Sequence, residues 1–563
     1  MTALRTLPEA LADAARTDKS FLFIADGIET RRSFAELRLA SLGVARALRE
    51  AGLRPGDLAA LVIDDAAQFL TTLCGASLAG IIPASLYPPV TAGNPSAYRE
   101  ATARIIRLAR ARAVITTSAL RQQFDDMRAS CPSIDVVLSR ETLDAPPLEP
   151  DHTPSLDNIA LVQFTSGSTA VPKGVVLTHR SLSANIDAIN GPAGLGSSAT
   201  DSALSWLPLY HDMGLIGMAL GPLYCGRPAV LLTPQAFARR PVEWLRAISR
   251  HRATISFAPN FAYALCVRRV KDRDLEGLDL SCWRVAGCGG EPIHAPTLTA
   301  FAEKFAPVGF RETSFLPSYG LAEHVLAATF APRGRRPRVE KMPADDLTEW
   351  RAAVPNNGSA DSAATLVSCG RPFPGHRLRI VDQHERELPE GQVGEIALAG
   401  PSVMQSYYEQ DELTAATLRN GWLYTGDLGY VSDGELFVCG RVKDIIIVNG
   451  RKYHPQDLEW GVENLAGIRH GRIVAFGAPR HGGPDRVVIV AEPSGTVASD
   501  VLSDAIRCRI GDLCGLPVDD VVLVRNGTVA RTTSGKVQRA AIKARYERGE
   551  LVDGGGDQGG LRA

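Results

Sequence analysis

The chain has 563 residues, enough for about three or four domain-sized units, and its 45% hydrophobic and 22% charged residues are ordinary for globular proteins. This composition excludes disordered, collagen-like and fibrous proteins. The 61 basic and 62 acidic residues leave a net charge of −1, which argues against nucleic acid or an anionic membrane surface as the main partner.

Cysteine and lysine usage narrows the class of protein further. The ten Cys are scattered from Cys74 to Cys514, without a Cys-x-x-Cys pair or the spacing of a zinc site. Free thiols in a reducing cytoplasm are therefore expected. Only nine of the 61 basic residues are Lys, so each Lys is a candidate for a specific role.

No segment is expected to cross a membrane. The first 19 residues lack the apolar core of a signal peptide. The longest uncharged stretch, Ala66–Tyr98, is interrupted by Gly and Pro, whereas a spanning helix needs about 20 predominantly apolar residues. We predict a buried helix over Ala66–Leu78, followed by a strand and a proline turn, in a cytoplasmic protein.

Short apolar runs alternate with amphipathic segments through the first 330 residues, which predicts an α/β fold of parallel sheets covered by helices. The expected strands are Phe21–Ile24, Leu58–Ile63, Ala113–Thr116, Ile159–Phe164, Ala229–Leu232, Thr254–Phe257 and Trp283–Ala286. The expected helices include Ser33–Ala51, Pro95–Arg110 and Arg240–His251. Later β runs between Gly and Pro turns suit a small β-barrel-like layer, namely Arg379–Asp382, Gly394–Ala399 and Glu435–Cys439.

The pattern restarts after Gly440 as a compact α+β unit of about 100 residues. We therefore expect a large N-terminal domain over residues 1–440, a small C-terminal domain over 444–550 and a disordered tail over 551–563. A polar, Arg-rich stretch, Ala331–Ala364, interrupts the large domain.

The strongest local signal is the segment Gln163–Gly174, which follows an apolar strand and is rich in Ser, Thr and Gly. Its backbone N–H groups, hydroxyls and Lys173 are what triphosphate oxygens need. It is not a Walker loop, because Pro172 and Gly174 flank the Lys. The alternative is a flexible Ser/Gly surface loop.

Other polar residues stand in turn-rich settings that suit a binding site. His211 follows a Pro turn and precedes Asp212, although a lone His is more often a satisfied surface or core residue. Within Leu316–Glu323, Tyr319 could stack on a base and Glu323 could hold a divalent cation. Asp427 lies in a tight turn and could accept hydrogen bonds from a ribose diol, or simply cap the turn. Further along, Arg441 and Lys443 open the second domain, and Lys536 ends the loop Thr532–Lys536.

Together and in this order, these segments resemble the adenylate-forming superfamily of acyl-CoA synthetases, non-ribosomal adenylation domains and luciferases. Within it, the chain is most similar to the fatty acyl-AMP ligases. That similarity is carried by Trp206–Gly217, Ala258–Cys266, Val367–Pro372 and Tyr453–Glu459. The chain departs from the family pattern at Gly289–Pro292, at Ala530–Arg531 and at His324–Val325, and the last of these leaves the acyl-chain length open.

The resemblance implies a role for each matching residue. By this resemblance, ATP would be bound through its phosphates, adenine and ribose by Thr165, Ser166, Gly167, Ser168, Thr169, Lys173, Gly289, Gly290, Glu291, Ser318, Tyr319, Gly320, Asp427 and Arg441. Lys536, His211 and Glu323 would be catalytic, with Glu323 also binding Mg²⁺. Phe261, Tyr263 and Ala322 would border the acyl chain, and Lys443 would be the hinge, at 441–443, of a mobile small domain.

The implied activity is ATP-dependent conversion of a medium- or long-chain fatty acid to its acyl-adenylate. The acyl group would then pass to the phosphopantetheine thiol of an acyl carrier protein, or of a carrier domain in a polyketide or non-ribosomal peptide synthase. Two alternatives stay open: an acyl-CoA ligase that uses free CoA, and an inactive adenylate-binding scaffold. The intact Lys536, Glu323 and Asp427 speak against the scaffold.

Overall fold

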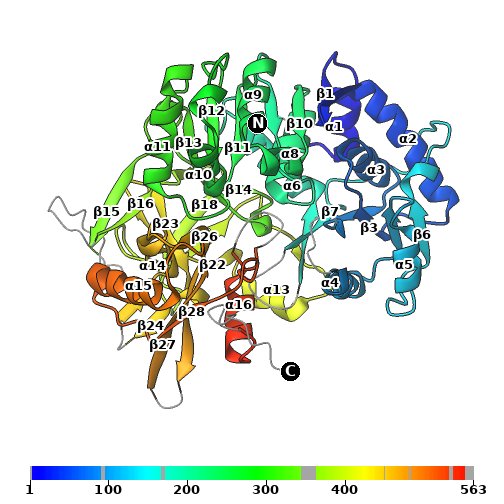
Figure 1. The fold of residues 1–563 in the computed structure, drawn as a ribbon. Helices are drawn as coiled ribbons and strands as arrows, with labels where there is room; N and C mark the ends of the chain where they lie inside the picture. Colours follow the sequence, from blue (N-terminus) through cyan, green and yellow to red (C-terminus); the bar gives the residue numbers. More distant parts are fainter. Residues whose placement is uncertain are drawn as a thin grey trace, which may run out of the picture.

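The computed structural model describes residues 3–89, 95–165, 172–343, 363–448, 451–480, 483–531 and 537–551. Figure 1 shows two helix-covered sheets in its upper and right-hand parts and the chain beyond residue 446, in orange and red, below them. The predicted α/β class is confirmed.

The first sheet has nine strands in the order β17-β14-β13-β12-β11-β9-β10-β1-β2, with a parallel centre and antiparallel edges. Its strands are β1 Ser20–Ala25, β2 Ile28–Ser33, β9 Ala203–Ser205, β10 Ala229–Leu232, β11 Ile255–Ala258, β12 Val285–Cys288, β13 Phe315–Gly320, β14 Ala327–Phe330 and β17 Arg371–Pro372. Parallel neighbours need long crossovers, which here are mostly helices.

The second sheet has seven strands in the order β20-β8-β7-β4-β3-β5-β6. They are β3 Leu58–Val62, β4 Ile82–Ser85, β5 Ala113–Thr116, β6 Val136–Ser139, β7 Ile159–Thr165, β8 Lys173–Thr178 and β20 Ser406–Tyr407. Alternate residues of β3 enter different hydrophobic clusters. Ala59 and Leu61 face the main cluster, while Leu58, Ala60 and Val62 face a second cluster that includes residues of α4 (Pro95–Leu108) and α5 (Arg121–Met127). The sheet is therefore buried on both faces, as a parallel sheet requires.

The helices around these sheets are α1 Leu7–Ala14, α2 Phe34–Glu50, α3 Ala66–Leu78, α4 Pro95–Leu108, α5 Arg121–Met127, α6 His179–Asn190, the π-helix η3 Met213–Leu220, α7 Gly221–Tyr224, α8 Pro234–Arg239, α9 Val242–His251, α10 Asn260–Arg269, α11 Ala295–Phe305 and α13 Asp411–Thr417. Capping boxes begin α1 and α2, through Thr6 with Glu9 and Ser33 with Glu36. The predicted helix Ala66–Leu78 matches α3, which packs in the main core. Among the described helices, none has the length and apolar run needed to cross a bilayer.

A third, smaller sheet stands where the β-barrel-like layer was expected. It follows the order β18-β19-β22-β21, with β23 beside β22, and it does not close into a barrel. Its strands are β18 Arg377–Val381, β19 Gly394–Ala399, β21 Leu418–Arg419, β22 Trp422–Ser432 and β23 Glu435–Arg441. A two-stranded sheet, β15 Val339–Pro343 with β16 Ala363–Val367, borders the polar stretch, and residues 344–362 lie outside the described chain.

Beyond residue 445 the chain has hydrophobic clusters of its own. Its elements are β24 Ile446–Val448, β25 Arg451–Tyr453, α14 Pro455–Val462, β26 Ile468–Arg480, β27 Gly483–Pro493, α15 Ser499–Cys514, β28 Asp520–Leu523 and α16 Arg539–Glu547. The predicted disordered tail lies outside the described residues, apart from Leu551. All ten Cys are free, as predicted.

Candidate active site

One cavity of ≈ 1950 Å³ collects the predicted site residues. Strand ends of the first two sheets, β22 and β23 of the third, and α14 and α16 of the C-terminal part contribute to its walls. The predicted residues that line it are Thr165, Lys173, His211, Phe261, Gly289, Gly290, Glu291, Ser318, Tyr319, Gly320, Ala322, Glu323, Asp427, Arg441 and Lys443. Ser166, Gly167, Ser168, Thr169 and Lys536 lie outside the described residues.

The two ends of the Ser/Thr/Gly segment are held together by strand pairing. Thr165 ends β7 and is paired with Lys173, the first residue of antiparallel β8. The Lys173 ammonium lies over the Tyr407 ring, 5.1 Å from its centroid. Burial lowers the pKa of Lys173, while the Glu323 carboxylate opposes that shift. The Lys173 ammonium is therefore a cation in the lining of the cavity.

Glu323 is fixed by the edge strand of the second sheet. The Tyr407 hydroxyl donates a hydrogen bond of 2.7 Å to Glu323 Oε1, and the Met404 N–H donates to the Glu323 carbonyl at 2.9 Å. Burial and the neighbouring Glu323 charge raise the pKa of Tyr407, so its hydroxyl keeps the proton it donates. The sequence did not point to Tyr407, because this residue is far from Glu323 along the chain and belongs to no recognised motif.

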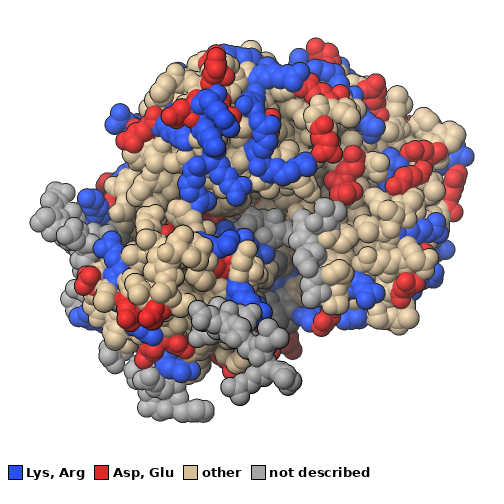
Figure 2. All heavy atoms as spheres, in the orientation of Figure 1, with Lys and Arg blue, Asp and Glu red and all other residues tan. Residues whose placement is uncertain are grey.

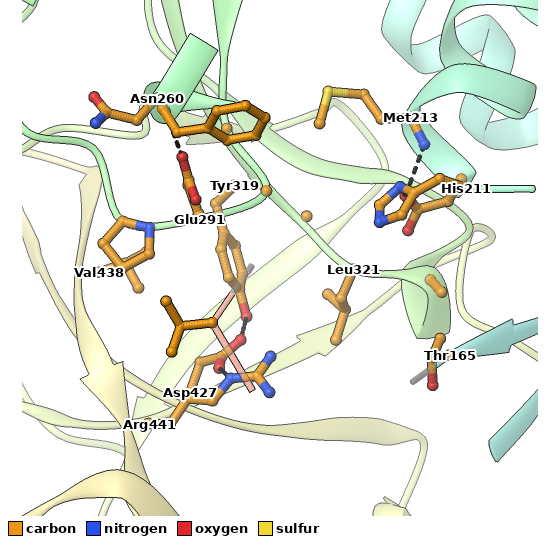
Figure 3. Close-up of a pocket in the computed structure, with 18 of the residues that line it drawn as sticks. Thr165, His211, Met213, Asn260, Glu291, Tyr319, Leu321, Asp427, Val438 and Arg441 are labelled. Carbon is orange, nitrogen blue, oxygen red and sulfur yellow. Dashed lines mark hydrogen bonds and ion pairs between the residues drawn. The ribbon is translucent and has the colours of Figure 1, made fainter. Parts of the chain in front are cut away.

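Asp427 is the centre of a second polar group (Figure 3). The Tyr319 hydroxyl donates to Asp427 Oδ2 at 2.8 Å, and Arg441 Nε lies 2.9 Å from Asp427 Oδ1. Asp427 and Arg441 are register partners of β22 and β23. The Asp427 charge raises the pKa of Arg441, and burial raises that of Tyr319. The group presents a fixed carboxylate and a cation side by side.

The segment after β12 approaches β13 too closely for side chains. A Cβ at Gly289 would lie 2.5 Å from Ser318 Oγ, and Gly290 has a φ of +78°, which favours Gly. Glu291 Oε1 accepts a hydrogen bond of 2.6 Å from the Phe261 N–H. Glycine therefore suits both positions and lets the backbone after β12 lie against Ser318 of β13.

His211 and Met213 lie across the cavity from Asp427 and Arg441 (Figure 3). The His211 Nδ1 atom is 2.6 Å from Asp212 Oδ1, and the same oxygen accepts from the Met213 N–H at the start of η3. This carboxylate therefore fixes the orientation of the imidazole relative to the helix.

Much of the lining is apolar, as a fatty acyl chain requires. Phe261 and Ala322 belong to it, as predicted. Tyr263 does not, because its ring is fully buried and its hydroxyl donates to the Gly287 carbonyl at 2.8 Å. The apolar lining residues that the sequence did not point to lie in or next to α6, η3 and β14, and they are Ile189, Leu195, Gly217, Met218, Leu326 and Phe330. The feature these residues have in common is hydrophobicity. Residues of the hydrophobic core have it too, so the sequence could not distinguish the two groups.

Lys443 lies in a short 3₁₀ turn, Val442–Asp444, where the third sheet gives way to the C-terminal part. The Arg539 guanidinium, almost fully buried, bonds Asp444 at 3.0 Å and Glu459 at 2.6 Å. Asp457 also lines the cavity, and burial raises its pKa to about 7. The sequence assigned no role to Arg539, Asp444 or Glu459.

The relatives of this chain include three informative proteins. A Caulobacter vibrioides protein, named provisionally as an acyl-CoA synthetase, is 38% identical over 92% of this chain and 91% of its own. The medium-chain fatty acid–acyl-carrier-protein ligase JamA of Moorena producens is 33% identical over 96% of this chain and 93% of its own. The long-chain fatty acid–AMP ligase FadD26 of Mycobacterium marinum is also 33% identical, over 96% and 97%.

Solved structures share the whole fold. One from work on fatty acyl-adenylate ligases of E. coli and L. pneumophila is 35% identical, covers 97% of this chain and 98% of that one, and has a TM-score of 0.90. A complex of McyG A-PCP with phenylalanyl-adenylate is 27% identical, covers 98% and 84%, and has a TM-score of 0.85. The family model described as AMP-binding enzyme matches residues 11–408. The chain belongs to the AMP-binding enzyme family.

Proposed function

We propose that this enzyme activates a medium- or long-chain fatty acid as its acyl-adenylate and then transfers the acyl group to a carrier protein's phosphopantetheine thiol. The observation that carries the first step is one cavity that joins the Lys173–Glu323 and Asp427–Arg441 groups to an apolar lining. The named activities of the fatty acid ligases among its relatives support both steps.

Adenylation brings two anions together, so charge neutralisation and positioning dominate the catalysis. A carboxylate oxygen attacks the α-phosphorus of ATP, forming the acyl–phosphate bond while the bond to the β-phosphate breaks and pyrophosphate leaves. We assign Lys173 to the phosphates, Asp427 and Arg441 to the ribose hydroxyls, and Tyr319 to the base. Lys536 is proposed to stabilise the charge that moves between carboxylate and α-phosphate.

Glu323 suits a magnesium ion that arrives with the nucleotide. Mg²⁺ is commonly bound through one or two carboxylates together with substrate phosphates. Glu323 supplies one carboxylate, and the described residues contain no cluster of three or more metal-ligating side chains. When bound, the ion would neutralise phosphate charge, while Tyr407 orients the Glu323 carboxylate.

The second step is proposed to use rotation of the small domain about Lys443. Lys443 lies between the separate hydrophobic clusters of the two parts. Rotation would remove Lys536 and admit the acceptor thiol, which explains why residues from both parts line one cavity. The second candidate acceptor is free CoA, favoured by the name of the Caulobacter relative.

Two measurements test this proposal. Pyrophosphate exchange into ATP should require both Mg²⁺ and a fatty acid, and equal exchange without fatty acid would contradict adenylation. Purified enzyme should then be offered CoA and phosphopantetheinylated carrier protein side by side. Faster acylation of the carrier supports the assignment, whereas equal or faster acyl-CoA formation makes the chain an acyl-CoA ligase.

A further inference from the structure

The rim of the cavity beside α10 carries two adjacent arginines. Arg268 and Arg269 form the last turn of α10, and both are exposed as well as lining the cavity. They therefore stand where the cavity meets solvent. Figure 2 shows basic side chains gathered above the central hollow, over the region of α9 to α11 in Figure 1.

These two charges differ from other arginines of the same region, which form close ion pairs. The charge of Glu463 acts on Arg268 only from beyond ion-pair distance, and it opposes the lowering of the Arg268 pKa by burial. Arg239 lies 3.0 Å from Asp26, and Arg250 lies 3.1 Å from Glu29. In the part of the chain that the structure describes, no carboxylate is within ion-pair distance of Arg268 or Arg269. Arg269 donates a 3.3 Å hydrogen bond to the Ala238 carbonyl. The rim thus has two positive charges available for a partner.

The polar groups on the opposite side of the rim already have hydrogen-bond or ion-pair partners there. His470 pairs with Glu463 at 2.6 Å, and Glu463 also accepts from the Gly471 N–H at 2.7 Å. Arg472 lies 3.9 Å from Glu492 and donates to the Val529 carbonyl. An anionic partner at this rim would therefore contact mainly the α10 side.

The lining next to the arginines is uncharged and includes small side chains. Ala264 and Val267 of α10 belong to it, and so do Pro296, Thr297 and Ala300 of α11. A phosphopantetheine arm is an uncharged chain with two amides, joined to its protein by one phosphodiester. Its chemistry matches an uncharged passage that ends at a pair of cations.

We propose that Arg268 and Arg269 are the docking surface for an acidic carrier protein and hold the phosphodiester of its prosthetic arm. This inference rests on the proposed transfer to a carrier. A carrier fits better than free CoA, because CoA adds a diphosphate, an adenosine and a 3′-phosphate, and the other rim cations named above are already paired. A bidentate Arg contact also suits a phosphodiester.

The test compares the wild-type enzyme with the double variant Arg268→Ala/Arg269→Ala. We expect unchanged fatty-acid-dependent pyrophosphate exchange and unchanged acyl transfer to pantetheine, which lacks the phosphate. The KM for phosphopantetheinylated carrier should rise about tenfold. The transfer rate should also become less sensitive to added salt, because charges at the rim of an interface are the ones that salt screens. Arg239→Ala/Arg250→Ala, which removes two paired arginines, is the matched control.

Each outcome decides for or against the docking surface. An unchanged carrier KM, an equal rise in the control, or a parallel loss of transfer to pantetheine would overturn it. Loss of transfer to CoA with carrier transfer intact would assign the arginines to CoA instead. If the wild-type enzyme forms adenylate but acylates no carrier, the proposed acceptor itself is wrong, and the docking surface falls with it.

Discussion

Gly217 of η3 faces Leu326 in the apolar lining, where an added Cβ would lie 2.9 Å from Leu326 Cδ2. We predict that Gly217→Val narrows the cavity and lowers kcat/KM for long acyl chains relative to short ones. A methylene group in a hydrophobic pocket changes selectivity about 10- to 200-fold, so a shift of about tenfold is expected. Kinetics with a series of fatty acids measure it.

The double variant Gly217→Val/Leu326→Ala is the control for this residue-scale prediction. Because the clash is with the flexible end of Leu326, shortening that side chain should restore part of the activity on long chains. If Gly217→Val lowered kcat/KM equally for short and long acyl chains, Gly217 would be needed for the structure of η3 and not for space around the acyl chain.

Lys536 is the residue whose removal should separate binding from chemistry. We predict that Lys536→Ala nearly abolishes acyl-adenylate formation while ATP still binds, because its charge is needed mainly in the transition state. One such contact is worth about 2.7–4 kcal/mol, or a rate loss of about 10²–10³. Calorimetry showing ATP binding lost in proportion to the rate would contradict this role.

At the scale of elements, α1 is attached to α6 through one buried histidine. His179, the first residue of α6, accepts a 3.1 Å hydrogen bond at Nδ1 from the Leu7 N–H at the start of α1. Burial lowers the pKa of His179 to about 4, and the charge of Glu9 opposes the shift. The folded protein therefore keeps this imidazole neutral at a pH where an exposed histidine is protonated.

We predict that this contact weakens the fold in acid. Between about pH 6.5 and pH 4 the unfolded chain binds a proton at His179 that the folded chain does not, so stability falls as the pH falls. A pKa lowered from 6.5 to about 4 corresponds to roughly 3 kcal/mol of stability, fully lost only below about pH 4. Above about pH 6.5 this group contributes no pH dependence.

Unfolding measured at about pH 7 and about pH 5 checks this prediction. His179→Gln should be less stable than wild type at neutral pH, because the imidazole contact is lost, yet lose less stability between the two pH values. His324 and His454, whose pKa values burial also lowers, titrate in both proteins and cancel in the comparison. An identical pH dependence would contradict the assignment to His179.

At the scale of the molecule, the described ends of the polar stretch are fixed to the third sheet. The Tyr430 hydroxyl donates to Glu340 Oε2 at 2.9 Å, and Arg338 bonds both Glu340 and Asp433. Leu366 of β16 packs against the cluster around Tyr430 and Phe437. To test the role of the polar stretch, it must be shortened without disturbing these contacts. A deletion that starts at Arg335 would remove buried contacts of β15, so the deletion should be confined to residues 344–362.

We predict that replacing residues 344–362 by a short Gly/Ser link keeps adenylation and increases acyl-CoA formation. If the intact stretch biases the small domain, a change of about 1.4 kcal/mol would shift its equilibrium about tenfold. Pyrophosphate exchange and acyl-CoA formation are measured on the same preparation. Normal exchange without any gain with CoA would show that the acceptor passage excludes CoA by itself.

The sequence alone determined the class of fold and most positions of the site. Apolar runs predicted strands such as Ala113–Thr116 and the helix Ala66–Leu78 with correct bounds, because local hydrophobic patterning reflects burial. Motifs located residues that line the cavity, from Lys173 to Arg441, because a motif fixes residue types at set spacings. Their contacts with phosphate and ribose stay predictions.

The tertiary structure decided which side chains meet. Tyr263 and Phe261 are two residues apart on one helix, yet only Phe261 reaches the cavity, since successive residues of a helix point in different directions. Tyr407 reaches Glu323, and Tyr319 reaches Asp427, across long separations in sequence. Such contacts depend on how the sheets pack, and no local pattern records that packing.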